Sequence, residues 1–101
     1  MKVCIIEMHY HSEYLNTLIQ LYPNSDVYTT KSVYDDLPES SKSLSKNFFF
    51  LGSQSKSQFI NSIPTQDYDL LFVNTIQETM LDLRNWKTLS HNANQFLHFT
   101  I

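Results

Sequence analysis

Five short segments rich in apolar or β-branched residues recur along the chain, separated by polar stretches. They occupy residues 2–8, 26–30, 48–51, 68–74 and 95–101. Their length and composition predict β-strands. The first, KVCIIEM, shows little alternation of apolar and polar positions, which indicates a strand buried on both faces, as in parallel sheets.

Helical patterns fill most of the intervals between these segments. A helix is expected to begin at Ser12, whose side chain predicts the N-cap, and to end before the Pro at position 23. Residues 32–37 predict a single helical turn, whereas the serine-rich residues 39–47 predict a loop. The side chains that fall on one face of the first helix are Tyr14, Leu15, Leu18, Ile19 and Tyr22.

Two capping boxes predict further helices. Residues 55–58 read SKSQ and residues 75–78 read TIQE, and both place Gln or Glu three residues after Ser or Thr. The first box is followed at helical spacing by Phe59, Ile60 and Ile63, and the second contains Ile76 and is followed by Met80, Leu83 and Trp86.

The alternation of strands and helices predicts an α/β fold. We expect one domain over residues 1–101: a three-layer, Rossmann-like, five-stranded parallel sheet in the order 3-2-1-4-5, with helices on both faces. Because the sequence ends within an apolar strand, we expect the N-terminal part of a longer protein. A missing C-terminal domain or a second copy would then cover the last strand.

Composition and charge narrow the range of possible functions. The 101 residues carry a net charge of −3 with scattered Lys and Arg, which argues against a nucleic-acid partner. No apolar run is long enough for a transmembrane segment, and no signal peptide is present, so we expect a cytoplasmic location. The single cysteine, Cys4, is expected to be a buried thiol. A single glycine, Gly52, excludes glycine-rich phosphate loops, and we predict no cofactor.

The candidate ligand-binding residues follow the first and fourth predicted strands. In doubly wound sheets, ligands bind outside the carboxyl ends of the strands, where the strand order reverses. The residues expected there are His9, Tyr10, His11 and Ser12 from one loop, and Asn74 and Thr75 from the other. The imidazoles suit acid–base chemistry or hydroxyl binding. Two histidines without a third ligand at suitable spacing do not predict a metal site.

Each of these residues also has a structural explanation. The loop after the first strand is equally consistent with a solvated connection, and Thr75 is explained by helix capping. Glu7 is either a buried acid with a raised pKa or a strand-end residue paired with water or a charge. Residues 48–50, FFF, are expected in the core rather than at a stacking site. No residue is assigned a catalytic role.

Three segments together resemble a known family. The stretches DYDLLFVNT (67–75), QFLHFTI (95–101) and KVCIIEMHYH (2–11) are similar in order and spacing to the N-terminal Rossmann-like domain of GT-B glycosyltransferases. The resemblance implies an acceptor-side domain of an enzyme that transfers a sugar from a nucleotide-sugar donor to a sugar or polysaccharide acceptor. It further implies that this part is inactive alone. Many family members carry a glycine pair in the first loop, which this chain lacks.

The competing interpretation is a non-catalytic α/β module that binds a small ligand or a protein. A receiver-like module requires clustered acids after the first strand and a phosphorylatable Asp after the third. Here Glu7 stands alone and the third strand ends at Leu51-Gly52, which disfavours the receiver-like form.

Overall fold

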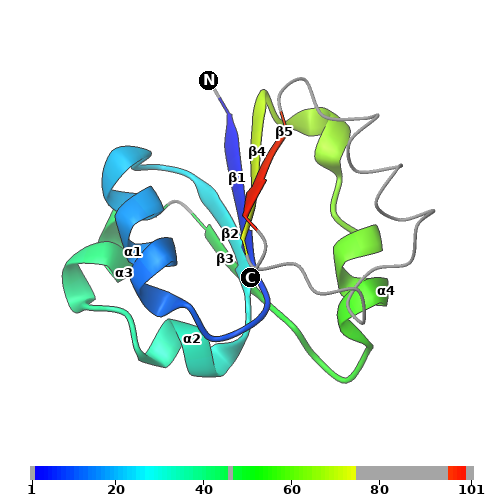
Figure 1. Ribbon diagram of the computed structural model, residues 1–101, viewed down its shortest axis with the longest axis horizontal. Coiled ribbons are helices and arrows are strands. Elements are labelled where there is room, and N and C mark those ends of the chain that lie inside the picture. The colour runs from blue at the N-terminus through cyan, green and yellow to red at the C-terminus, as the bar shows by residue number, and fades with distance from the viewer. Residues whose placement is uncertain (1, 46, 75–95, 100–101) are drawn as a thin grey trace.

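A parallel β-sheet forms the centre of the molecule. The computed structural model describes residues 2–45, 47–74 and 96–99 (Figure 1). The strands are β1 (Val3–Glu7), β2 (Asp26–Thr29), β3 (Asn47–Phe50), β4 (Leu70–Asn74) and β5 (Phe96–Phe99).

The strand order β3-β2-β1-β4 confirms the predicted order of the first four strands, and β5 pairs in parallel with the other side of β4. Glu7, the last residue of β1, lies opposite Thr29 on one side and Asn74 on the other. From β1 the chain adds β2 and β3 on one side of the sheet and then returns to add β4 on the other side of β1. The strand order therefore reverses between β1 and β4. This is the position at which α/β sheets bind ligands.

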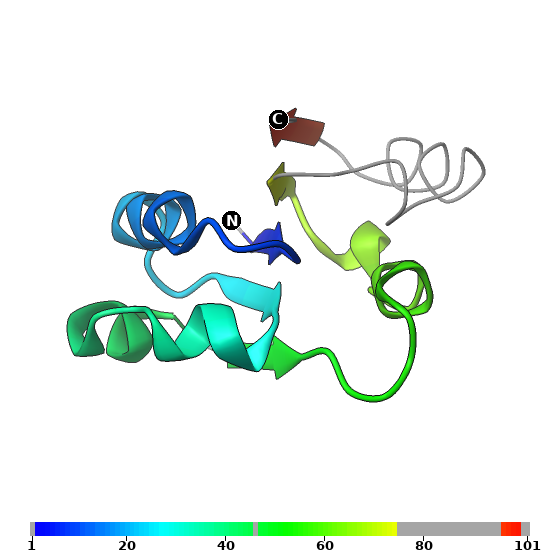
Figure 2. The same ribbon diagram turned by 60° about the horizontal axis from the view of Figure 1, so that its bottom comes forward.

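Helices cover both faces of the sheet, as predicted (Figure 2). The helices α1 (Ser12–Leu21), α2 (Lys31–Asp35) and α3 (Glu39–Leu44) lie on one side. On the other side lie α4 (Lys56–Asn61) and the short 3₁₀ helix η1 (Thr65–Asp67). None of the helices in the described part of the chain is long and apolar enough to cross a membrane.

Two apolar clusters fill the space between the sheet and these helices. Alternate residues of β1 enter different clusters, so β1 is buried on both faces, as the sequence predicted. The cluster beneath α4 contains Cys4, Ile6, Met8, Tyr28, Phe59, Ile60, Ile63, Tyr68, Leu71 and Val73. The cluster beneath α1 and α2 contains Val3, Ile5, Leu15, Leu18, Ile19, Val27, Val33, Leu37, Leu70 and Phe72.

The serine-rich segment after Pro38 is a helix, α3, and the predicted loop over residues 39–47 is wrong. The reason lies in tertiary contacts. Ser41 is fully buried and its hydroxyl donates to Asn16 of α1, while the side-chain amide of Gln20 donates to Ser41 Oγ at 3.0 Å. Polar side chains thus hold α3 against α1, and no apolar stripe in α3 could have shown this.

Two predictions about aromatic burial are also corrected. The aromatic strand β3 lies at an edge of the sheet, and Phe49 and Phe50 are 40% and 38% exposed, so it is not a core strand. Tyr14 does not join the buried face of α1 and is exposed, because that face is already filled by Leu15, Leu18 and Ile19. The helix predicted to begin at Thr75 lies outside the described residues.

Candidate functional site

A buried carboxylate marks the carboxyl end of the central strand. Glu7 has no exposed surface and lies on the same face of β1 as Val3 and Ile5. Its Oε2 accepts a hydrogen bond from the backbone N–H of His9 at 2.9 Å, and its backbone carbonyl accepts one from Thr29 Oγ1 at 2.6 Å. Glu7 is therefore buried, as one of the two alternatives required, and it fixes the start of the loop after β1.

The loop after β1 carries a continuous row of rings. The ring centroids of His9 and Tyr10 are 3.8 Å apart, those of Tyr10 and His11 are 4.6 Å apart, and those of His11 and Tyr14 are 5.8 Å apart. Tyr10 is 66% exposed and Tyr14 is 54% exposed, so the row opens to solvent. We call these four side chains the ring row. The structure brings together three of the predicted site residues, His9, Tyr10 and His11, and adds Tyr14.

The N-cap of the first helix lies one residue earlier than expected. His11 is the N-cap of α1, and its side chain makes no capping hydrogen bond, so the prediction that Ser12 caps this helix is wrong. Ser12 occupies the first helical position instead. The Nε2 atom of His11 is buried, and no hydrogen-bond partner for it lies among the described residues. Nε2 of His11 is thus a buried polar atom within the ring row that no described residue satisfies.

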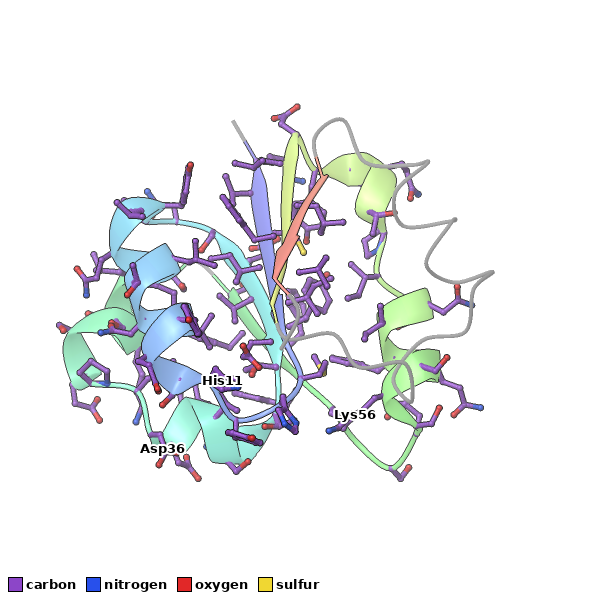
Figure 3. The ribbon with its side chains drawn as sticks, viewed as in Figure 1. His11, Asp36 and Lys56 are labelled. Atoms are coloured by element: carbon purple, nitrogen blue, oxygen red, sulfur yellow. The ribbon has the colours of Figure 1, made fainter. Side chains whose placement is uncertain are left out.

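Lys56, which lies on the face of the sheet opposite α1, is close enough to the ring row to affect His9. The pKa of His9 is lowered mainly by partial burial. The positive charge of Lys56 lowers it further, and so, to a smaller extent, does the charge of His11. Lys56 is the first residue of α4, whose N-terminus is fixed by the predicted capping box between Ser55 and Gln58. Figure 3 shows His11, Asp36 and Lys56 at the same end of the sheet.

The remaining predicted site residues are only partly placed. Asn74 ends β4 opposite Glu7, which puts its backbone at the expected position beside the first loop. Thr75 lies outside the described residues. The sequence analysis missed Thr29, although it ends β2 beside Glu7, is fully buried and holds the Glu7 carbonyl. A threonine at the end of a β-prone run carries no signal that separates this role from ordinary strand propensity.

The chemistry available at this edge is hydrogen bonding, ring stacking and proton transfer by imidazole. Within residues 2–45, 47–74 and 96–99, no group of three or more His, Cys, Asp or Glu side chains is arranged to hold a metal ion. Cys4 is fully buried in β1, and burial, with a smaller effect of Asp26, holds the pKa of its thiol well above the usual range. Cys4 is therefore a core residue and lies away from the ring row.

Comparison with known proteins gives no further assignment. No family model, curated protein sequence or solved structure matches the chain. The function is therefore argued from the carboxyl edge of the sheet itself.

Proposed function

We propose that this chain is the acceptor-side domain of a GT-B-like glycosyltransferase and that the carboxyl edge of its sheet binds a sugar or polysaccharide acceptor. The observation that carries the proposal is the solvent-facing ring row, which begins two residues after the buried Glu7. It stands where the strand order reverses, which is the usual ligand position in such sheets.

The ring row suits a ligand that is neutral and rich in hydroxyl groups. Tyrosine presents an apolar ring together with a hydroxyl group, so it can pack against a sugar ring and hydrogen-bond to it. The lowered pKa of His9 keeps its imidazole neutral near pH 7, where it both donates and accepts a hydrogen bond. The single glycine of the chain follows β3, so the first loop has no glycine-rich turn for a donor phosphate.

Each side chain then has a proposed role. Tyr10, the most exposed ring of the row, packs against the acceptor. The His11 imidazole, whose Nε2 has no hydrogen-bond partner among the described residues, rotates to bring this atom to one of the acceptor's hydroxyl groups. Glu7 positions the loop through the His9 N–H. Asn74, from the neighbouring strand, is proposed to bind the other side of the acceptor, together with Thr75.

The proposal is tested by nuclear magnetic resonance titration of the chain with cello-, malto- and chito-oligosaccharides and, separately, with UDP-glucose and GDP-mannose. We expect one oligosaccharide to shift the amide signals of residues 9–12 and neither nucleotide sugar to bind tightly. Tyr10→Ala should weaken the oligosaccharide response. The matched control is Leu21→Ala, because Leu21 is 65% exposed at the far end of α1. Tight binding of a nucleotide sugar, or no response to any oligosaccharide, would contradict the proposal.

The second candidate is a non-catalytic α/β module that binds a small ligand or a protein. The absence of glycine from the loop His9–Ser12 favours it, because many GT-B domains carry a glycine pair there. In the same titration this candidate predicts no response to oligosaccharides, while a non-carbohydrate ligand shifts the signals of residues 9–12.

A further inference from the structure

The outer edge of β3 leaves backbone hydrogen-bonding groups open. In the described part of the chain, β3 pairs only with β2. The N–H of Leu51, directly after β3, donates to the carbonyl of Thr29 at 3.0 Å and therefore points toward β2. Because successive residues of a strand turn their backbone groups to opposite sides, Phe49 also points toward β2. The N–H and C=O groups of Phe48 and Phe50 consequently point away from the sheet.

The side chains of β3 present aromatic rings on both faces of this edge. The rings of Phe48 and Phe50 are nearly parallel, with an interplanar angle of 8° and centroids 6.4 Å apart, and Tyr34 contacts both edge-to-face. On the opposite face, Phe49 stacks on Tyr28 at 4.6 Å. The edge is therefore ordered by ring contacts and partly exposed.

The usual protection of an edge strand is missing here. Exposed edges are commonly guarded by charged side chains, especially lysine, or by proline. Residues 47–55, NFFFLGSQS, contain neither a charge nor a proline. The nearby Lys31 lies over the rings of Tyr34 and Phe50, and Lys42 lies over Tyr34, so both amines are placed against the ring face. Within the described residues, β3 itself therefore carries no charge or proline that would keep another strand from pairing with it.

We propose that β3 pairs with β3 of a second copy of this chain, antiparallel across a twofold axis, so that one sheet runs through both copies. One register uses the outward backbone groups of both residues of the strand at once. When Phe48 lies opposite Phe50 of the second copy, both residues have outward backbone groups, and the two equivalent pairs form four hydrogen bonds. Phe49 then lies opposite Phe49 of the second copy on the axis.

The side chains favour this occupant over an unrelated strand. In this register the parallel rings of Phe48 and Phe50 continue across the axis as two aromatic cross-strand pairs, which stabilise antiparallel sheets. In this register the uncharged residues 47–51 face their own copy, without like-charge repulsion. A twofold interface of this kind is closed and stops at a dimer. It also lies at the opposite side of the sheet from β5 and is independent of the ring row.

A charge-pairing experiment tests the twofold axis. Phe49→Lys and Phe49→Glu both remove the contact with Tyr28 and place a charge opposite its own copy. We expect a dimer for the unmodified chain by sedimentation velocity and a monomer for each variant alone. An equimolar mixture of the two variants should restore a dimer containing one of each. Circular dichroism establishes that both variants are folded.

A second pair of variants separates the backbone from the side chain. Phe50→Pro removes the outward N–H and spares the pairing with β2, whereas Phe50→Ala removes only the ring and serves as the matched control. Loss of two of the four hydrogen bonds should weaken dimerisation about 30-fold more in the proline variant. The proposal is overturned if the unmodified chain is monomeric. This holds also if the monomer pairs its β3 edge with a strand of an unrelated protein. A dimer insensitive to both Phe49 variants and to Phe50→Pro overturns it equally.

Discussion

The buried pair of tyrosines gives a prediction that can be worked out quantitatively. Tyr28 and Tyr68 are 7% and 4% exposed, and their hydroxyl oxygens are 3.1 Å apart. Tyr68 also donates to Asp26 Oδ2 at 2.8 Å. A hydrogen bond to a charged group contributes about 1.5–3 kcal/mol, and a neutral one about 1 kcal/mol. Tyr68→Phe removes both and should cost about 3 kcal/mol, whereas Tyr28→Phe should cost about 1 kcal/mol.

The same pair makes stability depend on alkaline pH. Burial is the main cause that raises the pKa of Tyr68 above its ordinary value, and its hydrogen bonds to Tyr28 and Asp26 raise it further. Burial likewise raises the pKa of Tyr28. A raised pKa stabilises the folded state fully below the unfolded value of about 10, and this stability is lost as the pH rises above it. Each proton retained only by the folded state contributes a slope of about 1.4 kcal/mol per pH unit.

The measurement is urea unfolding followed by circular dichroism, at pH 7 and at intervals above pH 9. In the range where both protons are retained, the unmodified chain should lose stability more steeply than the Tyr28→Phe, Tyr68→Phe double variant, by about 2.7 kcal/mol per pH unit. Cys4, whose pKa is also raised, contributes equally to both proteins and cancels. Tyr10→Phe is the control, because Tyr10 is 66% exposed. Equal alkaline slopes, or costs at pH 7 that simply add in the double variant, would refute the reasoning.

Three further predictions concern the helix cap, the thiol and the core. Ser55→Ala should cost about 1 kcal/mol, because it removes the capping box of α4, while Ser53→Ala, at an exposed position before that helix, should cost nothing measurable by urea unfolding. The Cys4 thiol should react with a disulfide reagent such as DTNB only when the chain unfolds, since it is fully buried with a raised pKa; rapid reaction in the folded state would contradict this. Leu71→Ala should cost about 2–5 kcal/mol, because the side chain is fully buried in β4, whereas Leu21→Ala, at a 65% exposed position, should be nearly neutral; equal costs would show that the core is placed wrongly.

The fold was predictable where one rule about strands and one about crossovers act together. Buried parallel strands require continuous apolar runs, and VCII in β1 and LLFV in β4 meet this requirement without help from tertiary structure. Right-handed crossovers then leave few strand orders, and the observed order β3-β2-β1-β4 is among them. The helix α3 was not predictable because its stability depends on Ser41 reaching α1, a contact between residues far apart in sequence.

The site was predictable in position but not in detail. The end of β1 marks the loop that carries His9 and His11, and the parallel register brings Asn74 opposite Glu7. The contributions of Thr29 and Lys56 come from other elements, and only the folded arrangement brings them to this edge. A sequence pattern reports periodicity within one element, so it cannot show such convergence.

The electrostatic link between Lys56 and His9 tests that convergence directly. Lys56→Gln removes the positive charge that helps to lower the pKa of His9, so this pKa should rise. It should stay below the ordinary value, because partial burial is the larger cause and remains. The pKa is measured from the imidazole Cε1–H signals by nuclear magnetic resonance at low ionic strength, and added salt should shrink the difference between the two proteins. Lys2→Gln is the matched control, since Lys2 precedes β1 at the amino end of the sheet. If Lys56→Gln leaves the His9 titration unchanged, or Lys2→Gln shifts it equally, the start of α4 does not lie beside the ring row.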